Sequence, residues 1–188
     1  YGYENPSAVV WLAVDYDGTI YIYRELYQTG LTYSQLGRKI KLLQEHNERT
    51  EYNVADTSMF SKTLDTGEYG QDILAKEGVP ILQANKERVA GWNLMHDYLR
   101  LHKIKVFREC TNVIRTIPAL IYKDGSEDVD KTGEDHLADA IRYALMSLPP
   151  IPEKTAPVVH NPYSKDKDSP WYNSGEVKDP YSYDNLKL

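Results

Sequence analysis

Glu134-Asp135-His136-Leu137-Ala138-Asp139-Ala140-Ile141-Arg142-Tyr143 begins the most clearly patterned helix of this chain and carries three potential metal ligands. Asp135 and Asp139 are four residues apart, so they share one face of a helix, with His136 next to Asp135. Much earlier, Asn53-Val54-Ala55-Asp56 has the pattern of a strand that ends in a carboxylate. Carboxylates from two distant elements are suited to a divalent-metal site, and this pairing points to metal-dependent nuclease chemistry.

Each acid also has an ordinary structural explanation. The helix expected over 134–148 would bury an apolar stripe formed by Leu137, Ile141, Ala144, Leu145 and Leu148. Asp139 lies almost opposite this stripe and fits a solvated surface residue. Asp135 fits a favourable charge near the start of the helix, and Asp56 fits a turn cap. Periodicity alone therefore leaves both interpretations open.

The remaining pattern along 1–148 favours an α/β fold. The apolar run 8–14 is typical of a strand buried on both faces of a sheet, and Asp15 and Asp17 fit a turn that leads into an antiparallel strand at 19–26. Thr32 and Gln35 form a capping-box pattern at the start of a helix. The expected elements that follow are helix 32–46, strand 52–56, helix 72–77, strand 79–83, helix 87–101, strand 104–107, and helix 111–122, interrupted near Pro118. This order predicts a sheet of mixed direction.

Composition limits the classes of function. The chain has 188 residues, of which 41% are hydrophobic, enough for one domain with a sizeable core and an appendage. A net charge of −6 argues against coating nucleic acid through bulk charge, although a local basic groove remains compatible with it. Cys110 is the single cysteine, which favours a reducing compartment. We expect no signal peptide and no membrane-spanning segment.

The composition changes at Pro149. Seven of the ten prolines lie in 149–188, mixed with tyrosine, serine, lysine and aspartate. Such a segment cannot bury enough apolar surface to offset the entropy of ordering, so we expect an extended or disordered tail. Trp171, Tyr172 and Tyr181 could anchor a partner, but a passive linker is the favoured interpretation.

Several segments of 1–148, taken in order, resemble one known family. They are Tyr1-Gly2-Tyr3-Glu4-Asn5-Pro6-Ser7-Ala8, Asp17-Gly18-Thr19-Ile20-Tyr21, Ala55-Asp56, Asn85-Lys86-Glu87-Arg88-Val89-Ala90-Gly91-Trp92 and His136-Leu137-Ala138-Asp139-Ala140-Ile141-Arg142-Tyr143. Together they resemble the C-terminal nuclease domain of a large terminase subunit from tailed double-stranded DNA phages. The resemblance implies an RNase H-like mixed central sheet flanked by helices over 1–148.

The resemblance also implies an activity, that of a divalent-metal-dependent endodeoxyribonuclease which cuts concatemeric phage DNA with two Mg²⁺ or Mn²⁺ ions. By this match Asp56 is the second-strand carboxylate and Asp139 the helix carboxylate, and both are catalytic residues and metal ligands. His136 is a third catalytic residue and Asp135 an assisting ligand. Lys86 and Arg88 are the expected DNA contacts. In the family pattern a first carboxylate lies just upstream of Tyr1, and without it we expect weak metal binding and low cleavage.

Partners and alternatives follow from the same resemblance. We expect double-stranded DNA, the terminase ATPase domain, the small terminase subunit and the portal as partners, no membrane, and a location in the host cytoplasm during phage assembly. A different class of function is a catalytically silent RNase H-like module that docks DNA or the portal. A sugar-kinase or actin-like ATPase fold ranks last, because its phosphate loops need more glycine than the regions around Asp56 and Asp139 contain.

Overall fold

A computed structural model of the protein describes residues 5–44, 48–63, 67–126, 128–130 and 133–149. Contacts divide the chain into two units, Tyr1–Ile151 and Pro152–Leu188, and the fold below is that of the first. The aromatic residues of the expected tail, Trp171, Tyr172 and Tyr181, lie outside the described residues. Within the described ranges no helix is both long and apolar enough to cross a membrane.

The main sheet is mixed, as the sequence predicts. Strand β1 (Ser7–Val14) pairs antiparallel with β2 (Ile20–Gln28), and β5 (Ile104–Val106) joins β2 in parallel, so the order is β1-β2-β5. The hairpin turn is held by Asp15, whose Oδ1 accepts hydrogen bonds from the Asp17 and Thr19 amides at 2.9 and 2.8 Å. The prediction that these aspartates serve the turn is consistent with this geometry.

An irregularity in the hairpin distributes its side chains over two faces. Trp11 pairs with Arg24 and Leu12 with Ile22, which leaves Tyr23 as an extra residue in β2. An extra residue reverses the alternation beyond it. Ile20 and Ile22 therefore enter one apolar cluster, whereas Leu26 joins Trp11 in the other. The sheet is thus packed on both faces, as expected for the apolar run of β1.

A second, two-stranded sheet carries the first candidate acid. Strands β3 (Val54–Ala55) and β4 (Leu82–Gln83) pair in parallel and are shorter than the predicted strands 52–56 and 79–83. Asp56 follows β3 directly and begins the 3-10 helix η1 (Thr57–Phe60). The Asp56 carboxylate is therefore held between a strand end and a helical turn.

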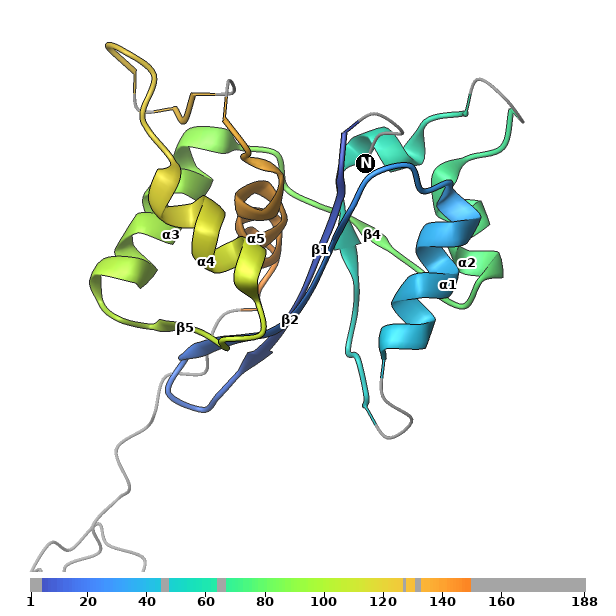
Figure 1. Ribbon diagram of the computed structural model, residues 1–188, viewed down its shortest axis with the longest axis horizontal. Coiled ribbons are helices and arrows are strands. Elements are labelled where there is room, and N and C mark those ends of the chain that lie inside the picture. Colours follow the sequence, from blue (N-terminus) through green and yellow to red (C-terminus); the bar gives the residue numbers. More distant parts are fainter. Residues whose placement is uncertain (1–4, 45–47, 64–66, 127, 131–132, 150–188) are drawn as a thin grey trace, which may run out of the picture. The chain divides into compact units, whose positions relative to one another are not determined.

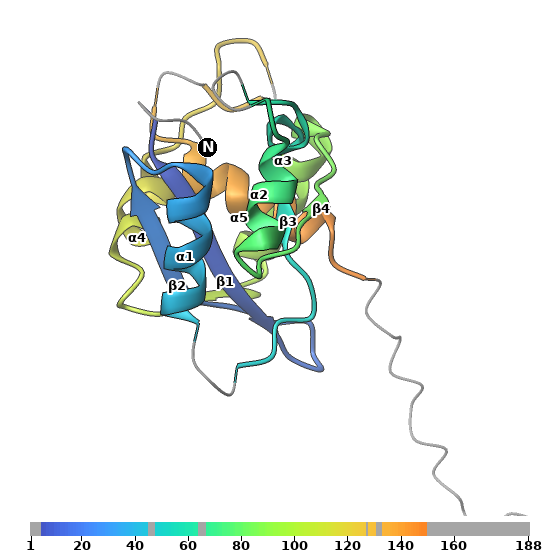
Figure 2. The same cartoon turned by 90° about the vertical axis from the view of Figure 1, so that its right-hand side faces the viewer.

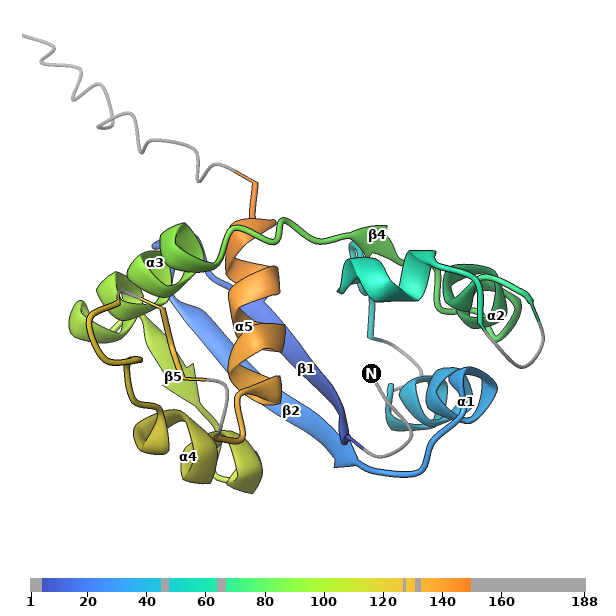
Figure 3. The same cartoon turned by 90° about the horizontal axis from the view of Figure 1, so that it is seen from above.

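Helices cover both faces of the main sheet (Figures 1, 2 and 3). Helices α1 (Tyr33–Leu43) and α2 (Gly70–Lys76) pack on the Trp11 cluster. The opposite cluster takes α3 (Arg88–Arg100), α4 (Thr111–Thr116), the short η2 (Ile117–Ala119) and α5 (His136–Met146). The predicted capping box of α1 is confirmed, because the side chains of Thr32 and Gln35 each accept a hydrogen bond from the other's backbone amide.

Helix α5 shows one departure from the predicted stripe. Leu137, Ile141 and Leu145 are buried as expected, whereas Ala144 and Leu148 are only half-buried. The buried face of α5 includes instead Ala138 and the charged Arg142, whose relative exposure is 1%. Because α5 packs against both α3 and β1, its apolar surface is wider than a single stripe.

Candidate functional site

Asp56 links β3 to α5 through hydrogen bonds. Its Oδ1 accepts the Ser58 amide at 2.8 Å, which caps η1. Its Oδ2 accepts the hydroxyl of Tyr143 at 2.7 Å, and Tyr143 lies on α5 one turn after Asp139. The strand-end carboxylate is therefore bonded to the helix that carries the second candidate acid.

These contacts keep Asp56 ionised. Burial by itself would raise the pKa of Asp56, but the hydrogen bonds from Ser58 and Tyr143 and the charge of Lys86 outweigh it, and the pKa falls from 3.8 to about 2. The Lys86 ammonium lies 3.8 Å from Asp56 Oδ2. The carboxylate is thus available as an anionic oxygen ligand at every physiological pH.

Asp139, in the first turn of α5, is held by a buried arginine. Arg142 donates to Asp139 Oδ1 from Nε at 3.1 Å and from Nη2 at 2.9 Å. Its Nη1 donates to the Glu87 carbonyl at 3.3 Å, and its guanidinium stacks over Trp92. A buried cation is tolerated when it is paired and hydrogen-bonded in this way.

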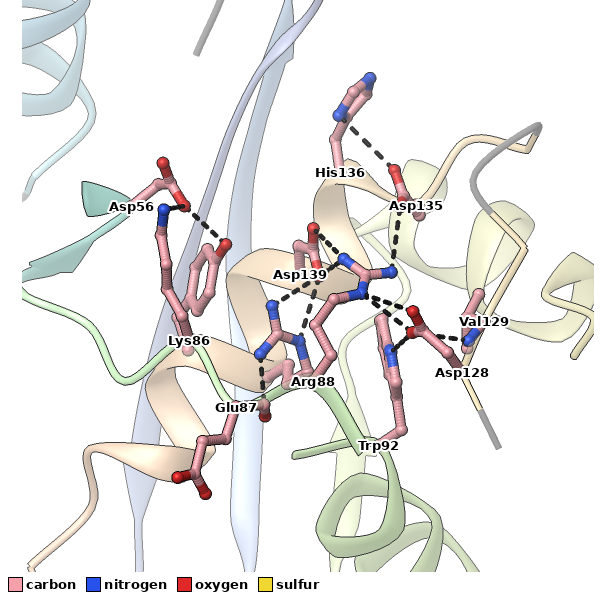
Figure 4. A network of polar contacts seen from close by, with 12 residues as sticks. Asp56, Lys86, Glu87, Arg88, Trp92, Asp128, Val129, Asp135, His136 and Asp139 are labelled. Atoms are coloured by element: carbon pink, nitrogen blue, oxygen red, sulfur yellow. Dashed lines mark hydrogen bonds and ion pairs between the residues drawn. The ribbon is translucent and has the colours of Figure 1, made fainter. Parts of the chain in front are cut away.

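Arg88 lies among three carboxylates. Its Nε donates to both oxygens of Asp128 at 2.9 and 3.1 Å, while its other nitrogens lie 3.5 Å from Asp139 and 3.8 Å from Asp135. Burial would lower the pKa of Arg88, but these anions raise it overall. Asp128 is itself held by the Trp92 indole N–H at 2.9 Å. Figure 4 shows Arg88 pointing into this acidic cluster.

The residues at the start of α5 differ in exposure. Burial raises the pKa of Asp135, and the charge of Asp139 raises it further, against the opposing effects of His136 and Arg88. The side chain of Asp135 is 12% exposed and that of His136 is 35% exposed, with His136 Nδ1 3.8 Å from Asp135 Oδ1. His136 is therefore the more accessible of the two for a substrate or a water molecule.

The donor chemistry of this region fits a hard divalent cation. Asp56 and Asp139 supply carboxylate oxygens from β3 and α5, the ligand type that Mg²⁺ and Mn²⁺ prefer. In the ranges that the structure describes, no three His, Cys, Asp or Glu side chains are grouped closely enough to hold an ion by themselves.

The structure groups the predicted site residues into two connected sets. Asp56 lies beside Lys86, and Asp139 shares Arg88 with Asp135, next to His136 (Figure 4). Both expected DNA contacts, Lys86 and Arg88, are turned toward acids.

Sequence reasoning missed three polar residues that organise the site, Asp128, Arg142 and Tyr143. Arg142 and Tyr143 follow Asp139 by three and four residues, a helical spacing that could have signalled contact. Asp128 has no such signal, because its partners Arg88 and Trp92 are distant in the sequence.

Comparison with known proteins gives a consistent result. A family model described as the terminase RNaseH-like domain matches residues 2–148. A solved structure of the P22 large terminase nuclease domain is 20% identical, with a TM-score of 0.59, 78% of this chain covered and 76% of that one. The large terminase of a thermophilic bacteriophage (crystal form 3) is 17% identical, with a TM-score of 0.65, 79% of this chain covered and 38% of that one. This chain thus spans little more than a third of the thermophilic phage protein. No curated protein matches.

Proposed function

The chain belongs to the terminase RNaseH-like domain family, and on that basis we propose that it is the metal-dependent endonuclease domain of a viral DNA-packaging terminase, which cleaves concatemeric double-stranded phage DNA. The observation that carries the proposal is the hydrogen bond from Tyr143 to Asp56. It connects the strand-end carboxylate to α5 one turn from Asp139, which supports the proposal that the two acids serve one site.

In this proposal Asp56 and Asp139 hold Mg²⁺ or Mn²⁺, with Asp135 assisting. A bound divalent ion supplies Lewis acidity toward a phosphodiester and lowers the pKa of a ligated water. Asp56 contributes a carboxylate that stays ionised near neutral pH, because its pKa lies at about 2. The half-buried His136 at the start of α5, whose side chain is 35% exposed, is the proposed residue that receives or returns a proton at an imidazole nitrogen.

DNA contact belongs to the same proposal. The side chain of Lys86 is 52% exposed beside Asp56, so its ammonium can pair with a phosphate that approaches this carboxylate. Arg88 is less exposed, at 23%, and its charge balances three acids. Lys86 is therefore the better candidate for a direct phosphate contact. The ATPase domain, the small subunit and the portal are proposed partners.

Plasmid cleavage tests the proposal. Supercoiled plasmid is incubated with the chain and Mn²⁺, with EDTA as the metal-free control, and also with a version lengthened upstream of Tyr1 to include the first carboxylate that the resemblance leads us to expect. We expect Mn²⁺-dependent nicking, low with the chain and higher with the lengthened version, that is lost in Asp56→Asn and Asp139→Asn and retained in Asp97→Asn on the exposed side of α3. Full activity in both site variants would refute the site assignment.

One observation favours the second candidate function, a silent docking module. Asp139 is bonded to Arg142 and contacted by Arg88, an arrangement that also suits a purely structural ion-pair network. The two functions differ in their response to metal. A docking module would bind DNA equally in EDTA and in Mn²⁺ and would leave the plasmid uncut, including with the lengthened version.

A further inference from the structure

We propose that Arg142 and Tyr143 are positioning residues, which fix the carboxylates of Asp139 and Asp56 in the orientation that a divalent ion requires. The inference rests on the function proposed above and deepens it. Arg142 and Tyr143 are consecutive residues of α5, and each donates to a different acid, one on the same helix and one at the end of β3.

Tyr143 holds the acid that lies outside the helix. The Ser58 amide fixes Oδ1 of Asp56 and the Tyr143 hydroxyl fixes Oδ2, so both oxygens have a defined direction. A carboxylate oxygen has about two acceptor sites, so one hydrogen bond fixes its direction without by itself excluding a metal ion. Without the hydroxyl, Oδ2 keeps only its longer ion pair with Lys86 at 3.8 Å, and its direction is less well defined.

Arg142 holds the acid on its own helix. Its two hydrogen bonds both reach Oδ1 of Asp139 and form a rigid fork with one oxygen. Oδ2 accepts a longer bond from Arg88 Nη1 at 3.5 Å, and the same nitrogen lies 3.5 Å from Oδ1, so Oδ2 is the less engaged oxygen and has more capacity left for a ligand. Because Arg142 is 1% exposed and stacks over Trp92 and Tyr143, its guanidinium has little freedom to move.

Gly91 provides the space in which Arg142 lies. A Cβ atom at position 91 would come within 2.6 Å of Arg142 Cγ and 2.8 Å of its Cδ. These atoms lie in the middle of a buried side chain, so a methyl group there must displace the guanidinium from Asp139. The close approach of α3 to α5 at Gly91 thus helps to fix the orientation of the Asp139 carboxylate on α5.

Titration with Mn²⁺ alone tests the inference without DNA or turnover. Free Mn²⁺ is followed by electron paramagnetic resonance as the protein is added. Partners that orient metal ligands typically change metal affinity 10- to 100-fold, so we expect Tyr143→Phe to raise the apparent Kd for Mn²⁺ about 10-fold. The matched control is Tyr27→Phe, whose lost hydroxyl donates to Glu134 at 3.1 Å, and its Kd should stay within about twofold of wild type.

A second variant reaches Arg142 without removing a polar group. Gly91→Ala should weaken Mn²⁺ binding by a factor of the same order as Tyr143→Phe. Its matched control is Gly133→Ala, because a Cβ at position 133 meets no atom within 4 Å. Thermal unfolding of every variant is measured in parallel, since a structural role alone would lower the midpoint and leave the affinity of the folded protein unchanged. If Gly91→Ala does not fold, the Mn²⁺ affinity of Tyr143→Phe alone tests the inference.

Two outcomes overturn the inference, and they are distinguishable. If Asp56→Asn and Asp139→Asn bind Mn²⁺ as wild type does, the proposed metal site is wrong and the inference falls with it. If those two variants lose Mn²⁺ while folded Tyr143→Phe and Gly91→Ala retain wild-type affinity, the proposed function stands and the positioning role is refuted.

Discussion

Replacing Asp56 with asparagine should destabilise the protein at neutral pH through loss of charge alone. Asparagine keeps a carbonyl oxygen that can cap η1, so the variant mimics the protonated carboxyl. The pKa of Asp56 lies at about 2 rather than 3.8, and one pKa unit corresponds to about 1.4 kcal/mol, which gives an upper limit of about 2.5 kcal/mol. Because 26% of the side chain is exposed, solvent screening reduces the expected loss to about 1–1.5 kcal/mol.

The loss should depend on pH with a defined sign. The pKa is depressed in the folded state, so the ionised carboxylate contributes its full stabilisation above about pH 3.8 and loses it as the pH falls through about 2. At pH 3 roughly half of the contribution remains. The difference between wild type and Asp56→Asn should therefore shrink by about half between pH 7 and pH 3.

Urea unfolding followed by circular dichroism at both pH values measures this difference. The control is Asp97→Asn, which removes an exposed ion pair with Arg100 and should change stability by less than about 0.5 kcal/mol. Equal stability of Asp56→Asn and wild type at pH 7, or a difference that grows toward pH 3, would refute the assigned hydrogen bonds and the sign of the pKa change.

Three further changes test other parts of the structure. Asp135→Asn should raise the stability at pH 7, because a carboxyl whose pKa is raised by burial opposes folding when it is ionised. The gain should vanish below the ordinary pKa of 3.8, and a loss of stability at pH 7 in urea unfolding would contradict this. Leu137→Ala removes a fully buried side chain and should lower the free energy of unfolding by about 3 kcal/mol, measured by calorimetry. The control is Leu42→Ala, which should lower it by about 0.5 kcal/mol or less, because Leu42 is 84% exposed. Thr32→Ala should cost about 1 kcal/mol in thermal unfolding, because it removes the side-chain cap of α1, and an unchanged midpoint would show that the cap contributes nothing.

The elements that sequence reasoning predicted correctly have strong local signals. The apolar run and turn of the hairpin, the capping box at Thr32 and the periodicity of α5 each depend on residues close together in the chain. The ends of β3 and β4 were predicted less well. Both strands are short, and their extent depends on their pairing with each other, which residues distant in the sequence determine.

The acids of the candidate site were proposed from the sequence, whereas their hydrogen-bond partners were not. Asp56 and Asp139 followed from the resemblance, because they match its motifs. Arg142 could not be placed in the core by hydrophobic periodicity, which ranks an arginine as exposed; its burial depends on Gly91 and Trp92 of α3. The bond between Tyr143 and Asp56 spans much of the sequence, so only the tertiary structure reveals it.

Anomalous diffraction from crystals soaked in Mn²⁺ tests most directly whether β3 and α5 form one metal site. Data collected near the manganese edge locate the ion independently of any assumed ligand. We expect an anomalous peak within coordination distance of carboxylate oxygens from both Asp56 and Asp139. A manganese ion coordinated by neither residue would contradict this expectation. So would an ion coordinated by only one of them while the other carboxylate keeps its present hydrogen bonds.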